Sequence, residues 1–248
     1  LSQHIGNLEN LQTYTDYRHH LKLYQNLFDF QPDVIVIDKH PEYLSSKLGR
    51  QWAADSQIPL IETQHHHAHI AACLVDNHWK MQQGAVIGVA LDGLGYGDDD
   101  TVWGSEFMVA DYTQFTRLAC LKPVALPGAH KAMTEPWRNT YAQLTQQTDW
   151  QNIVERYPDL TLIQFLQQQP VKVLDKMIHS HLNSPMSSSC GRLFDAIAAA
   201  LGICQQRISY EGQAAIELEA LITPQDLTLA TPYPFSIEAG ELSTINTS

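Results

Sequence analysis

A cluster of histidines offers the clearest chemistry in this sequence. Four of the twelve histidines lie between His65 and His69 in the segment QHHHAHI, and an apolar run at residues 70–75 follows directly. The run predicts a helix, on which His65 and His69 stand one turn apart on the same face. Two imidazoles at that spacing can hold one divalent metal ion, whereas His66 and His69 form a less favourable pair.

The position of the cluster on its helix bears on its metal chemistry. A helix N-terminus disfavours protonation of nearby imidazoles, and the neutral ring is the form that binds metal. The same dipole repels a cation, so we expect a carboxylate from another element to complete the site. Two imidazoles with one carboxylate suit zinc and iron alike. The alternative interpretation is a polar helix start with solvated or capping histidines.

A glycine-rich segment after the next strand contains a suitable carboxylate. Residues 85–91 predict a buried strand that leads into DGLGYGDDD at residues 92–100. Asp92 stands at the strand end, where α/β sheets place their ligands, and is the predicted third metal ligand. Gly93 and Gly95 would let backbone N–H groups approach a phosphate, although an ordinary glycine hairpin has the same pattern. The aspartates that end the segment predict a solvated turn.

Three further stretches contain candidate contacts for an anion or a nucleotide. Gly191 opens a helix after a serine-rich loop, and Asp195 could accept hydrogen bonds from ribose hydroxyls or simply favour the helix dipole. Gly212 begins a second glycine turn into a helix, on which Glu217 is predicted as a face charge. Arg138 follows a Pro-Gly loop and is a candidate anion contact, with a surface ion pair as the alternative.

Hydrophobic periodicity around these motifs predicts an α/β protein in two parts. Residues 1–84 alternate helices with short apolar strands, which favours parallel strands joined by crossover helices. Residues 85–248 begin with an antiparallel meander and continue into a long helical stretch. The strands of the meander are expected at residues 85–91, 101–111 and 115–121. After residue 223 the chain is rich in Thr, Pro and Ser, which predicts a tail without a capped element.

Composition excludes several classes of function. The formal net charge of −12 argues against binding to a phosphate backbone, so we expect no nucleic-acid partner. The four cysteines have no paired spacing, which indicates reduced thiols in a cytoplasmic protein, and no apolar run is long enough to span a membrane. Each part lacks strands of a common plan and the chain begins at Leu1, so we expect a piece of a longer protein.

Six segments, in this order, resemble the C-terminal region of the HypF family, the hydrogenase maturation carbamoyltransferases. They are LSQHIGNL from Leu1, QHHHAHIAA from Gln64, VIGVALDG with GYGD from Val86, EPWR from Glu135, GRLFDA from Gly191 and YEGQAAIELE from Tyr210. The resemblance implies a fold similar to the actin and sugar-kinase (ASKHA) ATPases. Two ribonuclease-H-like halves, both truncated here, would enclose a nucleotide, and a helical insertion would interrupt the second.

The same resemblance implies a reaction and its partners. In the family, a neighbouring domain uses ATP to join the carbamoyl group of carbamoyl phosphate to AMP. The region matched here would then pass that group from carbamoyl-adenylate to the C-terminal cysteine of HypE, for the cyanide ligand of nickel–iron hydrogenases. The other implied partners are upstream adenylate-forming, zinc-finger and acylphosphatase-like domains.

The resemblance also implies roles for individual residues. It assigns the metal to His65, His69 and Asp92. We expect catalytic contacts from Asp92 and from Arg138, the latter as the candidate anion contact named above. The residues implied for phosphate and adenosine are Gly93, Gly95, Gly191, Asp195, Gly212 and Glu217. The metal's implied work is electrostatic, because it would stabilise charge on the leaving AMP. A tRNA threonylcarbamoyl transferase and a non-catalytic docking module without metal are the alternative functions.

Overall fold

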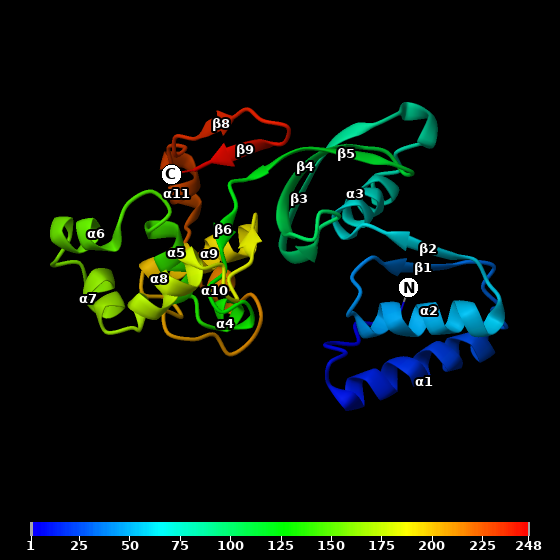
Figure 1. The fold of residues 1–248 in the computed structure, drawn as a ribbon. Coiled ribbons are helices and arrows are strands. Elements are labelled where there is room, and N and C mark those ends of the chain that lie inside the picture. The colour runs from blue at the N-terminus through cyan, green and yellow to red at the C-terminus, as the bar shows by residue number, and fades with distance from the viewer. Residues whose placement is uncertain (1, 248) are drawn as a thin grey trace. The chain divides into compact units, whose positions relative to one another are not determined.

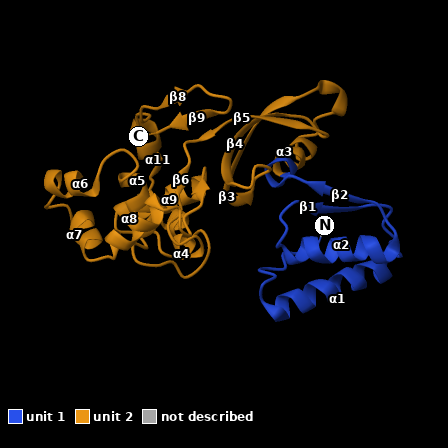
Figure 2. Ribbon diagram, in the orientation of Figure 1, with its two compact units in different colours: residues 1–68 blue, residues 69–248 orange. Residues whose placement is uncertain are grey.

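The chain forms two compact units, described here from a computed structural model that covers residues 2–247 (Figures 1 and 2). The units are Leu1–Ala68 and His69–Ser248. Their boundary falls inside a helix and earlier than the boundary predicted at residue 84. Within the described part of the chain, no helix combines the length and apolar character needed to cross a membrane.

Two parallel strands and two helices make up the first unit. Its helices are α1 (Leu11–Phe28) and α2 (Leu44–Ser56), and its strands are β1 (Ile35–Asp38) and β2 (Leu60–Thr63). The strands pair in parallel and α2 connects them, which confirms the predicted crossover.

The packing of α2 on β1 holds the end of that strand in place. Ile35 and Ile37 of β1 form a small core with Ala53 of α2. A side chain at Gly49 would overlap the Cγ2 methyl of Ile37, so only glycine permits this approach of helix to strand. Asp38, the last residue of β1, therefore projects from a well-packed element.

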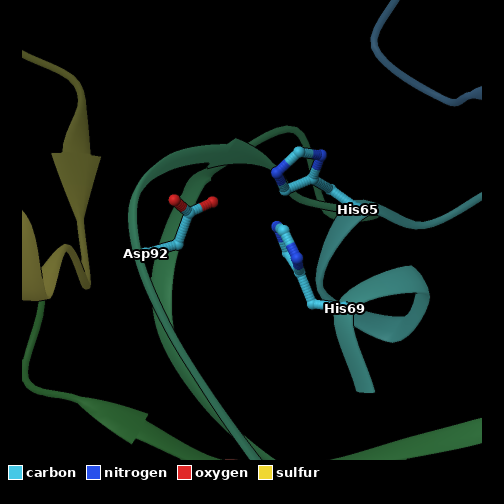
Figure 3. Close-up of side chains that lie close together, drawn as sticks. All are labelled: His65, His69 and Asp92. Carbon is cyan, nitrogen blue, oxygen red and sulfur yellow. The ribbon is translucent and has the colours of Figure 1, made fainter. Parts of the chain in front are cut away.

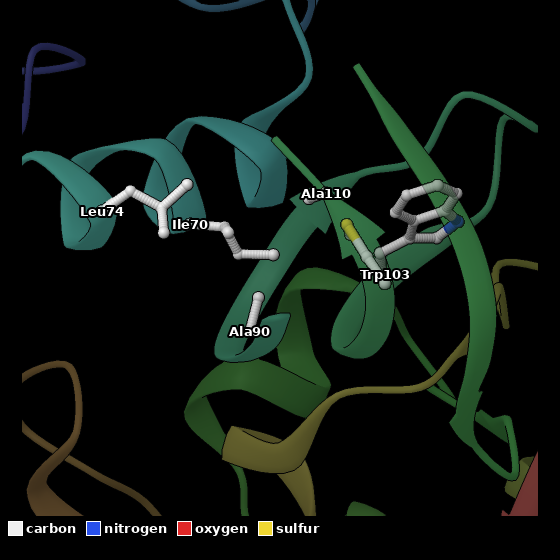
Figure 4. Close-up of a cluster of buried hydrophobic side chains, with 6 residues drawn as sticks. Ile70, Leu74, Ala90, Trp103 and Ala110 are labelled. Atoms are coloured by element: carbon white, nitrogen blue, oxygen red, sulfur yellow. The ribbon is translucent and has the colours of Figure 1, made fainter. Parts of the chain in front are cut away.

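Helix α3 contains the boundary between the units, and an antiparallel meander follows it in the second unit. Helix α3 (His65–Asp76) carries the histidine cluster, as predicted, and the 3-10 turn η1 (Met81–Gln83) follows it. The strands of the meander are β3 (Val86–Tyr96), β4 (Val102–Ala110) and β5 (Phe115–Leu121). β3 pairs with β4 and β4 with β5, both antiparallel, which confirms the meander. The core beneath them comprises Ile70, Leu74, Ala90, Trp103, Met108 and Ala110 (Figure 4).

The glycine-rich segment lies within β3 and does not form a separate loop. The pairing of β3 with β4 shifts between Leu91, which faces Ser105, and Gly95, which faces Trp103. Between these two pairs β3 advances by four residues while β4 advances by two, so β3 bulges here. Such bulges bend a strand and redirect its side chains, and they are common beside active sites. Asp92 lies at this irregularity.

A helical insertion follows the meander, and two further helices follow the insertion. After the short strand β6 (Val124–Ala125), the insertion contains α4 (His130–Thr134), α5 (Trp137–Leu144), α6 (Trp150–Arg156), α7 (Thr161–Gln167) and α8 (Val171–His179). Its core consists of Trp137, Tyr141, Leu166, Val171 and Leu174. The chain continues through β7 (Met186–Ser187), α9 (Cys190–Ala200) and α10 (Gln213–Glu219).

The tail after residue 223 is structured, and the prediction that it lacks a capped element is wrong. It contains α11 (Pro224–Leu229), β8 (Ser236–Glu238) and β9 (Ser243–Asn246). Helix α11 begins with a capping box between Thr223 and Asp226. β9 pairs in parallel with β5, so its partner is distant in sequence and local composition could not reveal it.

Candidate functional site

The start of helix α3 is held by Gln64. Its Oε1 accepts a hydrogen bond from the backbone N–H of His67 at 3.0 Å, which satisfies a donor left open by the helix end. The Nε2 of Gln64 lies 3.1 Å from Nδ1 of His66, and both side chains are buried. His66 therefore belongs to the packing of the helix start, which leaves His65 and His69 as the pair that shares the other face.

The structure brings the three predicted metal ligands together. The candidate ligand atoms of His65, His69 and Asp92 all lie within 4.8 Å of one another (Figure 3). His65 and His69 belong to one continuous helix, so the spacing of the two rings follows from α3 itself. Two imidazoles and one carboxylate are a donor set that suits a divalent transition metal. The residues present thus fit a metal ion.

The backbone around Asp92 is packed so closely that side chains are excluded from two neighbouring positions. A Cβ at Gly104 of β4 would lie 2.7 Å from Cα of Ser189 and 3.0 Å from the carbonyl oxygen of Asp92. A Cβ at Gly191 would lie 2.9 Å from Cα of Gly93. The β3 bulge, strand β4 and the start of α9 therefore meet at a junction that only glycines allow.

Ser189 links the start of α9 to the glycine-rich segment. Its hydroxyl accepts a hydrogen bond from the backbone N–H of Arg192 at 3.0 Å and donates one to the carbonyl of Gly93. The serine thus caps the helix and ties it to the β3 bulge. Gly93 is open on its side-chain face, since a Cβ there would meet no atom within 4 Å.

Asp195, the predicted ribose contact, is buried on α9. One of its oxygens lies 2.7 Å from Nε of Arg192, and only 1% of the residue is exposed. Burial raises the pKa of Asp195, and the charge of Arg192 and its hydrogen bond oppose the rise. Because α9 begins at Cys190, Asp195 lies beyond the first turn, and it is buried, so the alternative of a first-turn helix-dipole residue is wrong.

Helix α10 brings Glu217 toward the same region. Gly212 precedes α10 in the left-handed conformation, at φ 76°, and α9 and α10 share a core that includes Ala198 and Ala214. The thiol of Cys204 has a pKa raised to about 11 by burial, by a hydrogen bond with Glu217 and by the charges of Glu217 and Asp195. Cys204 thus faces both carboxylates, a relation that the sequence did not suggest.

Arg138 is a buried residue, and the alternative of a surface ion pair is wrong. Its Nε donates to Oε2 of Glu135 at 2.5 Å, and its guanidinium lies over the ring of Trp137, 4.8 Å from the centroid. Only 8% of the residue is exposed. The predicted catalytic role of Arg138 stays a prediction, because its described contacts are all within the helical insertion and the loop before it.

Sequence reasoning missed the carboxylate nearest to His65. Oδ2 of Asp38 lies 2.6 Å from Nδ1 of His65. The usable signal was the position of Asp38 at the end of an apolar run, because Asp92 directly follows the apolar run at residues 85–91 in the same way.

A buried carboxylate on β4 was also missed. Glu106 is fully buried and accepts hydrogen bonds from Nε of Arg117 at 2.6 Å and from the hydroxyl of Ser188 at 2.5 Å. Arg117 also donates to Asp99 at 3.0 Å and lies over the ring of Trp103. Residues 98–100 form an exposed turn, as predicted, and Asp99 also pairs with Arg117 from that turn.

Two family models together match most of the chain. One, described as "HypF Kae1-like domain", matches residues 1–76, and another, "Carbamoyltransferase, Kae1-like Domain, second subdomain", matches residues 88–248. The solved structure "Crystal structure of full-length HypF in the phosphate- and nucleotide-bound form" has a TM-score of 0.82 and 34% identity, over 98% of this chain and 30% of that one. HypF of T. kodakarensis has a TM-score of 0.78 and 29% identity, over 98% of this chain and 31% of that one. The shared fold is the Kae1-like α/β architecture, consistent with the predicted actin and sugar-kinase type.

Curated relatives of this chain are also named carbamoyltransferase HypF. Carbamoyltransferase HypF of Rhodobacter capsulatus is 41% identical over 221 residues, which are 89% of this chain and 29% of the relative. Carbamoyltransferase HypF of Synechocystis is 35% identical over 90% of this chain and 30% of the relative. The chain thus spans less than a third of either relative. The paired histidines lie within residues 1–76 and the glycine-rich segment within residues 88–248, the two ranges that the family models match. The chain belongs to the HypF carbamoyltransferase family.

Proposed function

We propose that this chain contains the site at which a HypF enzyme transfers a carbamoyl group from carbamoyl-adenylate to the C-terminal cysteine of HypE. In the complete enzyme, the adenylate would come from an upstream adenylate-forming domain that uses ATP, alongside the zinc-finger and acylphosphatase-like domains. The product would serve synthesis of the cyanide ligand of nickel–iron hydrogenases. The observation that carries the proposal is the convergence of His65, His69 and Asp92 within 4.8 Å.

The donor set explains what a bound divalent ion, zinc or iron, would contribute. When bound, the ion would supply positive charge for the phosphate oxygens of the adenylate and for the leaving AMP. His65 and His69 would hold it through neutral ring nitrogens and Asp92 through a carboxylate oxygen. The backbone N–H of Gly93 donates to Oδ1 of Asp92 at 2.6 Å and restrains that carboxylate.

The nucleotide part of the proposal rests on α9, α10 and the glycine-rich segment. Gly93 has space on its side-chain face and packs against Gly191, so a phosphate could approach the backbone there. Gly95 lies two residues further along β3, opposite Trp103. Asp195 and Glu217 would accept hydrogen bonds from ribose hydroxyls, with Gly212 allowing the turn between them. A relative solved in a "phosphate- and nucleotide-bound form" is in line with such a ligand.

The state of three of the four thiols supports an acceptor that comes from a partner. Burial raises the pKa of Cys190, and the pKa values of Cys120 and Cys204 are raised to about 11. These thiols are therefore protonated at neutral pH and are poor nucleophiles. The reactive thiolate would belong to the C-terminal cysteine of HypE.

The proposal is tested by mass spectrometry of HypE after incubation with the full-length enzyme, ATP and carbamoyl phosphate. We expect carbamoylation of the C-terminal cysteine by the wild-type enzyme. His69→Ala removes one metal ligand and should slow the reaction by about a hundredfold or more, because the charge of the ion is worth several kcal/mol to the transition state.

A matched control is His179→Ala. His179 is an exposed histidine in the last turn of α8, with 76% of its side chain accessible, so its loss should leave the rate unchanged. Full-rate carbamoylation of HypE by the His69→Ala enzyme would overturn the proposed site.

A further inference from the structure

Asp38 contacts a predicted metal ligand from a separate element. Oδ2 of Asp38, at the end of β1, lies 2.6 Å from Nδ1 of His65, at the start of α3. Only 20% of the Asp38 side chain and 25% of the His65 side chain are exposed. The contact is therefore short and largely shielded from water, and it engages one specific nitrogen of the ring.

The chemistry of a carboxylate decides which ring nitrogen carries the proton. An ionised carboxylate only accepts hydrogen bonds, so Nδ1 of His65 must be the donor. In a neutral imidazole the proton on Nδ1 leaves the lone pair on Nε2. Nε2 is then the atom that His65 offers to a metal ion.

Asp38 itself is held in place by two further hydrogen bonds. Oδ1 of Asp38 accepts the His40 N–H at 2.7 Å. The carbonyl of Asp38 accepts the hydroxyl of Ser46 in α2 at 2.9 Å, so β1 and α2 both fix its position.

We propose that Asp38 is a positioning residue that orients the ring of His65 and fixes its Nδ1–H tautomer, so that Nε2 coordinates the metal. The inference rests on the metal site of the proposed function. It adds a carboxylate that touches no metal and acts through the histidine. In metal sites, loss of such a partner typically lowers metal affinity 10–100-fold, because the ligand loses orientation and basicity.

The test measures zinc binding and the state of the ring in the full-length protein, with its zinc fingers already filled so that only additional zinc is counted. Zn²⁺ affinity is measured by competition with a chromophoric chelator, and ¹⁵N-edited NMR of the imidazoles reports the His65 tautomer. Asp38→Asn keeps the size of the side chain and removes its charge. We expect a loss of zinc affinity of about 10–100-fold, and the Nδ1–H form of His65 in the wild type.

Asp33→Asn is the matched control. Asp33 is an exposed aspartate just before β1, so this variant removes the same charge nearby without touching His65. We expect wild-type zinc affinity for it, and circular dichroism checks that both variants are folded. If Asp38→Asn does not fold, the wild-type tautomer alone decides the inference.

Three outcomes separate this inference from the proposed function. Wild-type zinc binding with unchanged affinity in Asp38→Asn would overturn the role of Asp38 and leave the metal site standing. An Nε2–H tautomer of His65 in the wild type would likewise overturn the role of Asp38 and leave the metal site standing. Failure of the wild-type protein to bind zinc, iron(II) or cobalt(II) would overturn the metal site and the inference together.

Discussion

Glycines at three positions determine how closely the backbone segments of the candidate site approach one another. Gly104 and Gly191 are in contact with neighbouring backbone, whereas Gly93 is open. Backbone atoms cannot move aside as the end of a flexible side chain can, so a methyl group at a closed position strains the fold. Glycine thus permits close backbone packing at Gly104 and Gly191, and at Gly93 it leaves room for a ligand.

Alanine substitution should separate these two roles. Gly104→Ala places a Cβ 2.7 Å from Cα of Ser189 and should cost about 1–3 kcal/mol of unfolding free energy. Gly93→Ala meets no atom within 4 Å, so its stability should stay within about 0.5 kcal/mol of wild type. Because its methyl group would occupy the space for a phosphate, Gly93→Ala should instead lose nucleotide affinity. Urea denaturation and calorimetric ATP titration measure the two effects, and equal destabilisation by both substitutions would contradict the prediction.

At the scale of elements, the packing of α3 on β3 determines where His69 stands. Ile70 follows His69 on α3 and packs over Gly88 of β3, where a Cβ would lie 2.8 Å from Cγ1 of Ile70. Ile70 is buried in the core that joins the helix to the meander (Figure 4). The absence of a side chain at Gly88 therefore sets the distance between helix and strand.

Gly88→Ala should push α3 away from β3 and destabilise the protein by about 1–3 kcal/mol. Ile70→Val removes the terminal methyl group that approaches the Gly88 position most closely. The double variant should therefore lose less unfolding free energy than the two single variants lose together, by about 0.5–3 kcal/mol. Urea denaturation of the four proteins measures the coupling. Ile87→Val, at an exposed position next to Gly88, is the control and should be additive with Gly88→Ala. Additive effects for Ile70→Val would show that this contact does not set the spacing.

The charge of the whole molecule bears on its class of substrate. Asp and Glu number 27 against 15 Lys and Arg, for a net charge of −12. The arginines of the site region are engaged by carboxylates, Arg117 by Glu106 and Arg192 by Asp195. Such a molecule repels a polyanion, which favours a protein acceptor over tRNA.

We expect no binding of bulk tRNA to this chain in an electrophoretic mobility assay at about 50 mM salt, where phosphate contacts are strongest. The physical reason is the net charge of −12. A basic RNA-binding protein in the same assay provides the positive control. Retention of tRNA that weakens with added salt would favour the alternative function, a tRNA threonylcarbamoyl transferase.

The sequence by itself determined the features that depend on local periodicity. One turn of helix separates residues four apart, so the shared face of His65 and His69 follows from their spacing alone. The alternation of helices with short apolar strands likewise identified the parallel pair in the first unit and the meander in the second. Asp92 was recognisable because it directly follows the apolar run at residues 85–91, where a strand end is expected. In the structure β3 continues to Tyr96, and Asp92 lies at its bulge.

Only the tertiary structure decided the relations between distant segments. The contact of Asp38 with His65, the position of Cys204 facing Asp195 and Glu217, and the pairing of β9 with β5 each join residues that no local pattern connects. The burial of Arg138 also depends on packing within the insertion. Helical spacing is a property of one continuous backbone, whereas these contacts depend on which surfaces pack together when the whole chain folds.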